Sequence, residues 1–262
     1  MNDVGSESKV PAITLGFWAI KILATTLGET FGDTVTMGWL HADVDANNGG
    51  YLIGTALFGV IFVVAVVVQV VVKRFNAWAY WLAIVASTTV GTTLADFADR
   101  SLGIGYAGGS ALLLLLVFIS LATWRGVVGR VDADAVTTPR AELFYWLTIT
   151  FSQTLGTALG DWTADGLELG FAGGAAAFSA ALVVVILLYR WTDLSRVLLF
   201  WSAFILTRPL GATVGDLLDK PQSQGGLEWS RPLASAVLAV AIIILVSVLP
   251  QRPGQPVESH VA

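Results

Sequence analysis

Four aspartates recur at one position of a repeated pattern, and they are the residues best suited to chemistry in this chain. They close the segments TTLGETFGD, TTVGTTLAD, QTLGTALGD and RPLGATVGD, as Asp33, Asp96, Asp161 and Asp216. Glu29 precedes the first of them by about one helical turn. Carboxylates, threonine hydroxyls and main-chain carbonyls are the ligands that Mg²⁺, Ca²⁺ and Mn²⁺ prefer. These five carboxylates therefore predict a site for a small hard cation or for protons.

Two further groups of polar residues lie inside apolar segments. Lys21 and Arg208 are ionisable, and such residues are costly inside a membrane and mark functional sites by default. Their candidate partners are Glu29 and the aspartates. Two interpretations stay open: a salt-bridge network that fixes helix packing, or an electrostatic gate beside an ion path. Three residues share one position of the repeat and are predicted to line that path: Thr25, Thr88 and Gln153.

Other chemistries are poorly supported. The chain has no cysteine and only two histidines, His41 and His260, and neither histidine lies in an apolar run. Thiolate or imidazole sites for Cu⁺ or Zn²⁺ and Ser–His or Cys–His nucleophiles are therefore missing from these segments. We expect no enzymatic activity and no cofactor. The 14 basic residues form no continuous patch, so we expect no nucleic-acid partner.

The composition indicates which elements must position these residues. Of the 262 residues, 55% are hydrophobic and 13% are charged, and the charged share is about half that of a soluble protein. A membrane helix needs about 20 mostly apolar residues. Eight runs approach or reach that length: 12–35, 51–72, 77–98, 106–124, 141–162, 171–189, 195–217 and 232–250. The sequence predicts an all-α polytopic membrane protein with eight transmembrane helices in one domain, residues 1–262.

Basic residues near the ends of the spans predict the orientation. Nine of them fall on the side of the N-terminus: Lys9, Lys73, Arg74, Arg125, Arg130, Arg140, Arg190, Arg196 and Arg252. The opposite loops hold three: Arg100, Lys220 and Arg231. Cytoplasmic loops carry the excess of Lys and Arg. We therefore expect a multi-pass protein of a bacterial plasma membrane with both termini in the cytoplasm.

A fourfold internal repeat organises the spans. The frame FW-x9-G-x3-GD in the first span recurs three times, with Trp at positions 18, 81, 146 and 201. Approximate repeats are 11–74, 75–137, 138–194 and 195–250. Each contains one polar and one plain apolar helix, which predicts four parallel helical hairpins. The shared tryptophans are interpreted as interfacial anchors or as pathway aromatics: Trp18, Trp81, Trp146 and Trp201.

Small residues in the repeat predict close packing of the odd-numbered spans. They form small-xxx-small pairs: Gly28/Gly32, Gly91/Ala95, Gly156/Gly160 and Gly211/Gly215. Such pairs let helix backbones approach where hydrophobicity cannot drive association. The odd spans should lie inside and the even spans should face lipid. Asp33 lies about 32 Å along a helix from Ala12, so the aspartates should meet near the non-cytoplasmic ends, unless each one only contacts interfacial water.

The repeat resembles a known family. The FW pairs and the four glycine-rich segments are similar to those of a bacterial family of uncharacterised membrane-anchored proteins built from four tandem two-helix repeats of unknown function. The resemblance covers residues 11–250. It implies an eight-helix membrane protein and no established activity.

The functional hypothesis is a transporter or exporter of a small hard cation, a divalent metal ion or one coupled to protons. Two alternatives stay open. The first is a non-transporting membrane scaffold or sensor, and the second is a carrier of an organic substrate with a pocket of tryptophans and Arg208. The expected partners are the lipid bilayer and a small ion. A monomer could hold a complete pathway, and the small-residue faces could also form a homodimer.

Overall fold

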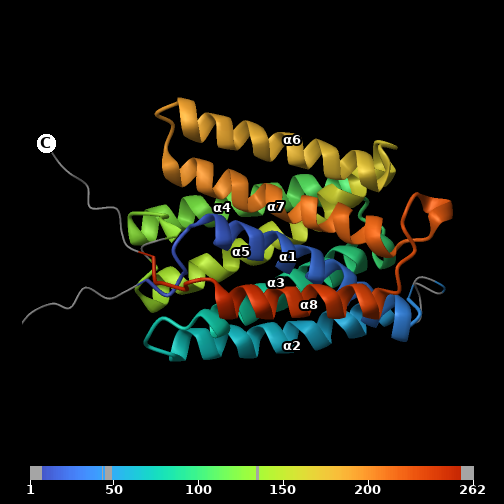
Figure 1. Cartoon of the computed structure of the whole chain (residues 1–262), viewed down its shortest axis with the longest axis horizontal. Helices are drawn as coiled ribbons and strands as arrows, with labels where there is room; N and C mark the ends of the chain where they lie inside the picture. The colour runs from blue at the N-terminus through green and yellow to red at the C-terminus, as the bar shows by residue number, and fades with distance from the viewer. Residues whose placement is uncertain (1–7, 43, 45–48, 134–135, 255–262) are drawn as a thin grey trace, which may run out of the picture.

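The computed structural model describes residues 8–42, 44, 49–133 and 136–254, and within them it contains eight α-helices and no β-strand (Figure 1). The all-helical fold predicted from the sequence is confirmed. The helices are α1 (Leu15–Asp33), α2 (Gly50–Val71), α3 (Ala77–Asp96), α4 (Tyr106–Val128), α5 (Pro139–Asp161), α6 (Gly170–Trp191), α7 (Arg196–Asp219) and α8 (Arg231–Val248).

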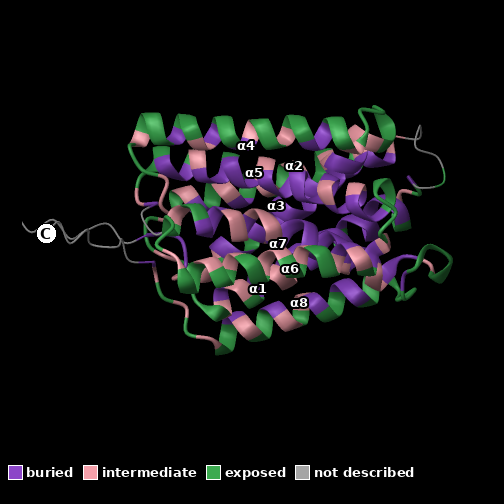
Figure 2. Ribbon diagram, turned by 90° about the horizontal axis from the view of Figure 1, so that it is seen from above, coloured by how far each residue is buried: buried purple, intermediate pink, exposed green. Residues whose placement is uncertain are grey.

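Four helices, α1, α3, α5 and α7, form a closed ring, and we call them the inner helices. Helix α1 packs on α3 and α7, and α5 packs on the same two helices from the other side. Buried residues concentrate on these helices, whereas α4 and α8 at the edges of the bundle are largely exposed (Figure 2). The ring is therefore built from the first helix of every repeat.

The outer helices, α2, α4, α6 and α8, do not pair as the predicted hairpins. Each packs mainly on the inner helix of the next repeat: α2 on α3, α4 on α5, α6 on α7 and α8 on α1. A glycine on α6 permits this contact, because a Cβ on Gly174 would lie 2.9 Å from Thr213 of α7. On α2, a Cβ on Gly54 would overlap Thr36, which follows α1, and would be in ordinary contact with Thr93 of α3, at 3.8 Å. The connection inside a repeat therefore crosses from one inner helix to its neighbour.

The inner helices start at side-chain caps. The N-cap side chains accept a hydrogen bond from the backbone N–H three residues on, at Thr14, Asn76, Thr138 and Ser195. Such a bond satisfies one of the free N–H groups of the first turn. The residues that precede the outer helices, Gly49, Gly105, Leu169 and Ser230, make no such bond.

Three inner helices change their winding directly after the repeat aspartate. A π-helical segment begins there in each case: η1 (Thr34–Trp39), η3 (Phe97–Ser101) and η5 (Trp162–Gly166). Such segments are rare and often lie at functional sites. In the fourth repeat, α7 continues as an α-helix to Asp219, and a short 3-10 turn, η6 (Gln222–Gln224), follows.

Six helices are long and apolar enough to cross a membrane: α2, α3 with η3, α4, α6, α7 and α8. Helices α1 and α5 are more polar, and each is enclosed by other helices of the bundle. Most of their polar side chains are buried against other helices, and Arg140 at the start of α5 is exposed. Six of the eight predicted spans therefore have the length and hydropathy of membrane-spanning helices.

The two ends of the described chain lie together. Ala12 N–H donates to the Arg252 carbonyl at 2.9 Å, and Gly254 N–H donates to the Val10 carbonyl at 2.8 Å. The described chain therefore begins and ends at the same end of the helical bundle.

Candidate functional site

The inner helices approach one another at the predicted small residues. A Cβ on Gly28 would overlap Thr88 of the next repeat, and a Cβ on Gly211 would overlap Thr25 of the first. The contact is cyclic, because each first glycine faces the residue three positions before the corresponding glycine of the next repeat. The other two contacts are Gly91 with Gln153 and Gly156 with Arg208. The predicted close packing is therefore made inside one chain, and these faces are not free to form a homodimer.

The second small residue of the pair repeats the same relation one turn later. Gly32 faces Thr92, Gly160 faces Ala212, and Gly215 faces Glu29, while Ala95 is 1% exposed. The ring is thus stacked in levels of four equivalent residues. One level holds Thr25, Thr88, Gln153 and Arg208, the next holds Glu29, Thr92, Thr157 and Ala212, and the third holds the four aspartates.

The predicted path residues connect helices in this structure. Thr25 Oγ1 lies 3.2 Å from the Thr207 carbonyl of α7, and Thr88 Oγ1 lies 3.1 Å from the Ala24 carbonyl of α1. Gln153 Nε2 lies 3.4 Å from Ser87 Oγ of α3. These side chains hold the ring together at the level below the carboxylates.

The repeat aspartates converge at the C-terminal ends of the inner helices. Lys220 forms ion pairs with Asp33 and, at 3.1 Å, with Asp216. Arg100 Nε lies 2.8 Å from Asp96 Oδ1. All four aspartates are 5% exposed or less. One oxygen each of Asp33 and Asp96 has no hydrogen-bond partner among the described residues.

Three carboxylates lie close enough to share one ion. One oxygen each from Glu29, Asp33 and Asp216 lies within 4.8 Å of the other two. Asp161, the remaining repeat aspartate, forms no ion pair in the described part of the chain, and its electrostatic neighbours are Asp216, Arg100, Asp96 and Glu29. We call Glu29 and the four repeat aspartates the acidic cluster.

The acidic cluster is only partly neutralised. Its five carboxylates face three basic residues, Arg100, Arg208 and Lys220, so two formal negative charges remain. Burial lowers the pKa of the Lys220 ammonium, but Asp216 and Asp33 raise it more, and the net pKa lies well above 10.5. Lys220 therefore stays cationic at physiological pH.

Glu29 also belongs to a second contact, deeper in the ring. Arg208 Nη2 lies 2.9 Å from Glu29 Oε2, 2.6 Å from Thr92 Oγ1 and beside Thr157 Oγ1. The salt-bridge network considered for Lys21, Glu29 and Arg208 thus includes the last two. Lys21 is outside it, with its Nζ 4.1 Å from the centroid of the Phe204 ring.

Four segments of the chain, residues 16–75, 79–127, 144–195 and 199–249, match the model of a family described as Repeat of Unknown Function (DUF347). The chain belongs to this family. The predicted fourfold repeat and the resemblance to a repeat family of unknown function are confirmed. No curated protein and no solved structure matches the chain.

The tryptophans of the DUF347 repeats lie inside the bundle, and this corrects their interpretation as interfacial anchors. Trp81, Trp146 and Trp201 are 2% to 3% exposed, and Trp18 is partly buried. An anchor would present its ring to the headgroup region. These rings instead pack on the aromatic residues that precede each tryptophan: Phe17, Tyr80, Tyr145 and Phe200.

These preceding residues form an aromatic layer at the N-terminal ends of the inner helices. The Phe17 ring lies 6.4 Å from those of Tyr80 and Phe200, and the Tyr80 hydroxyl lies 2.6 Å from that of Tyr145. Each DUF347 repeat contributes one aromatic side chain to this layer. The layer occludes the central axis of the four inner helices at the end opposite the acidic cluster.

Sequence reasoning missed two of the basic residues in the site. The spans predicted from hydropathy place Arg100 and Lys220 in loops. Both follow a repeat aspartate by four positions, Asp96 and Asp216, and residues with this spacing face each other on a helix. This spacing, in the second and fourth DUF347 repeats, is the sequence signal that indicates the two ion pairs.

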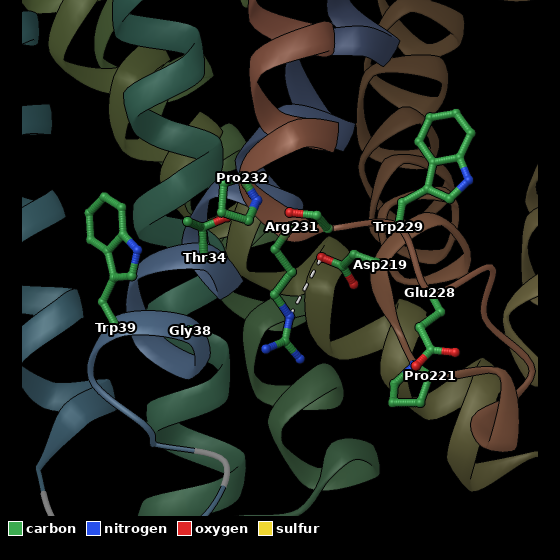
Figure 3. Close-up of a pocket in the computed structure, with 10 residues that line it drawn as sticks. Thr34, Gly38, Trp39, Asp219, Pro221, Glu228, Trp229, Arg231 and Pro232 are labelled. Carbon is green, nitrogen blue, oxygen red and sulfur yellow. Dashed lines mark ion pairs between the residues drawn. The ribbon is translucent and has the colours of Figure 1, made fainter.

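A cleft of about 480 Å³ lies at the end of the inner helices that holds the acidic cluster (Figure 3). Its lining includes Thr34, which follows Asp33, and Asp219, which precedes Lys220. Arg231 Nε lies 4.0 Å from Asp219 Oδ2 across the cleft. The cleft therefore opens to the surface close to Lys220, which forms ion pairs with Asp33 and Asp216.

Proposed function

We propose that this chain is an integral membrane carrier of a small hard cation. In this proposal all eight helices cross a bacterial plasma membrane, and both termini are cytoplasmic. Six helices are apolar enough to do so, and α1 and α5 are shielded by the other helices. The excess of Lys and Arg near the ends of the spans on the side of the termini supports the orientation.

The observation that carries the proposal is the cluster of Glu29, Asp33 and Asp216, with oxygens within 4.8 Å of one another. Oxygen ligands in this number suit a hard divalent cation. The Lys220 ammonium bridges two of these carboxylates. It thus takes the place of a metal ion as a tethered cation, and an arriving ion displaces it.

Access to this site is one-sided. The cleft at Asp219 leads from the surface to the acidic end, while the aromatic layer occludes the other end of the axis. An ion bound at the cluster would enter from the non-cytoplasmic side in this conformation. Release on the other side requires the aromatic rings to separate.

One alternative loses its supporting feature. A carrier of an organic substrate was expected to form its pocket from the tryptophans and Arg208. Trp146 and Trp201 pack on neighbouring rings, and Arg208 pairs with Glu29. These groups are engaged within the protein.

The test is ion flux into vesicles that contain the purified chain, with Mn²⁺, Mg²⁺ and Ca²⁺ measured separately. We expect Asp33→Asn and Asp216→Asn each to lower the flux of the carried ion at least tenfold, because each removes a charged ligand. Asp193→Asn, at an exposed position outside the helices, should leave flux unchanged. Lys220→Met should tighten Mn²⁺ binding severalfold, read by loss of the free Mn²⁺ resonance signal.

Flux equal to that of empty vesicles would overturn the proposal and favour a non-transporting scaffold or sensor. Normal flux in both aspartate variants would exclude the acidic cluster as the site of the carried ion. Weaker Mn²⁺ binding in Lys220→Met would contradict the displacement of Lys220.

A further inference from the structure

The middle of the ring holds hydrogen-bond donors that lack an acceptor. Within the described residues, no partner is present for Lys21 Nζ, for Nε and Nη1 of Arg208, or for Ser152 Oγ. All three side chains are 0% exposed. A buried donor without an acceptor costs about 1–3 kcal/mol, and a charged one costs more.

These donors share one section of the ring. Lys21 extends from α1 to α7, where its Nζ lies over the ring of Phe204. Arg208 follows Phe204 by about one turn of α7 and lies close enough to Lys21 to act on its charge. Ser152 lies on α5, next to Gln153, which occupies the same level as Arg208.

The balance of donors and acceptors reverses along the ring. The unpartnered atoms in the middle include one acceptor, Gln153 Oε1, and an amide can exchange its oxygen and nitrogen by a flip. At the acidic end, acceptors outnumber donors among the described atoms that lack a partner: they include oxygens of Asp33, Asp96 and Asp219, beside the Tyr51 hydroxyl. A ligand of the opposite charge therefore suits the middle of the ring.

The surroundings limit the size of that ligand. Below Lys21 the aromatic layer occludes the axis, and above Arg208 the side chains of Thr92 and Thr157 contact its Nη2. Lys21 and Arg208 bring two basic groups into this section against one carboxylate, that of Glu29. One small monovalent anion would supply their unpartnered donors with an acceptor.

We propose that this section of the ring binds one small inorganic anion of about the size of chloride, between Lys21, Arg208 and Ser152. The anion would act as the acceptor for the donors of these three side chains. The site is separate from the acidic cluster, and the proposal goes beyond cation transport and does not rest on it.

The test is thermal unfolding of the purified full chain in detergent, followed through its 10 tryptophans. Sodium gluconate is replaced by sodium chloride at constant ionic strength. We expect chloride to raise the unfolding midpoint by several degrees, since a ligand that binds only the folded state stabilises it. Sodium bromide should act in the same way and give an anomalous scattering peak beside Lys21 in crystals.

Three variants localise the effect. Lys21→Met should abolish the chloride response and should be more stable than the wild type in gluconate, because it removes a buried amino group that has no hydrogen-bond acceptor. Ser152→Ala should weaken the response. Lys73→Met, at an exposed position after α2, should keep the full response.

An unchanged midpoint of the wild type in chloride and bromide would overturn the anion site, and water would then be the occupant. A chloride response retained in Lys21→Met would overturn it as well. Asp33→Asn separates the two proposals: it should lose cation flux and keep the chloride response. A missing chloride response with normal cation flux overturns the anion site alone.

Discussion

The inner and outer helices differ in opposite directions in the burial and in the polarity of their side chains. In their most apolar stretches, α3 and α7 bury 72% and 61% of their residues, whereas the outer helices bury 11% to 28%. Yet the inner helices hold the acidic cluster, and the outer helices expose Val, Leu and Ile. Polar groups avoid lipid because nothing there can satisfy them. The inner helices thus pack by specific contacts with one another, whereas the outer helices present apolar side chains to the surroundings of the bundle.

The largest expected difference between the two regions is steric. In Gly156→Leu the new side chain would collide with Arg208 on the neighbouring inner helix, whose backbone lies 3.1 Å from a Cβ at this position. The cost should exceed the stability of a typical domain, about 5–15 kcal/mol, so no folded protein should be recovered. Gly108→Leu on α4 meets nothing within 4 Å and should behave as the wild type. Size-exclusion chromatography of the detergent-extracted variants measures this, and equal recovery of both would break the distinction.

The second difference is electrostatic. Arg208→Met leaves Glu29 buried and without its cation, which should destabilise the chain by about 3–5 kcal/mol. Arg125→Met, exposed on α4, should change stability by less than about 0.5 kcal/mol. Glu29→Gln should recover part of the loss when combined with Arg208→Met, and denaturant unfolding gives each value. Equal stability of the two arginine variants would show that the buried pair contributes nothing.

The smallest difference concerns helix starts. Thr138→Ala removes the side-chain cap of α5 and should cost about 1 kcal/mol. Ser230→Ala, before α8, removes a side chain that makes no cap bond and should be neutral. Unfolding curves of the two variants give the comparison. A matching loss in both would remove capping from the features that separate inner from outer helices.

The ring and its levels could be predicted because the spacing of the repeat is constant. Helical geometry fixes the height and direction of Gly28 and Asp33 relative to Trp18, and four copies of the same spacing must meet in register. The pairing of Glu29 with Arg208 was also within reach, since two opposite charges inside apolar segments need each other.

Other features depend on neighbours that the repeat does not specify. Gly54 carries no sign of which inner helix it will contact, so the docking of α2 on α3 could not be predicted. The sequence does not indicate whether the rings of Trp81 and Trp201 face lipid or pack in the core. Lys220 lies beyond the predicted span 195–217, and although its spacing from Asp216 indicates their pairing, nothing in the repeat specifies its second partner, Asp33 on α1.

The packing of each outer helix on the next repeat has a consequence for how such a chain can be cut and built. Because α8 closes on α1 and Gly254 lies beside Val10, a circular permutant opened between Asp193 and Leu194, with Gly254 linked to Ser8, would retain every interhelical contact. By the same logic, four separate copies of an ancestral two-helix unit could assemble as a domain-swapped tetramer, each lending its second helix to the adjacent subunit. Gene fusion would then have made the four copies free to diverge, and residues such as Lys21 and Arg208 could arise once instead of four times around the axis.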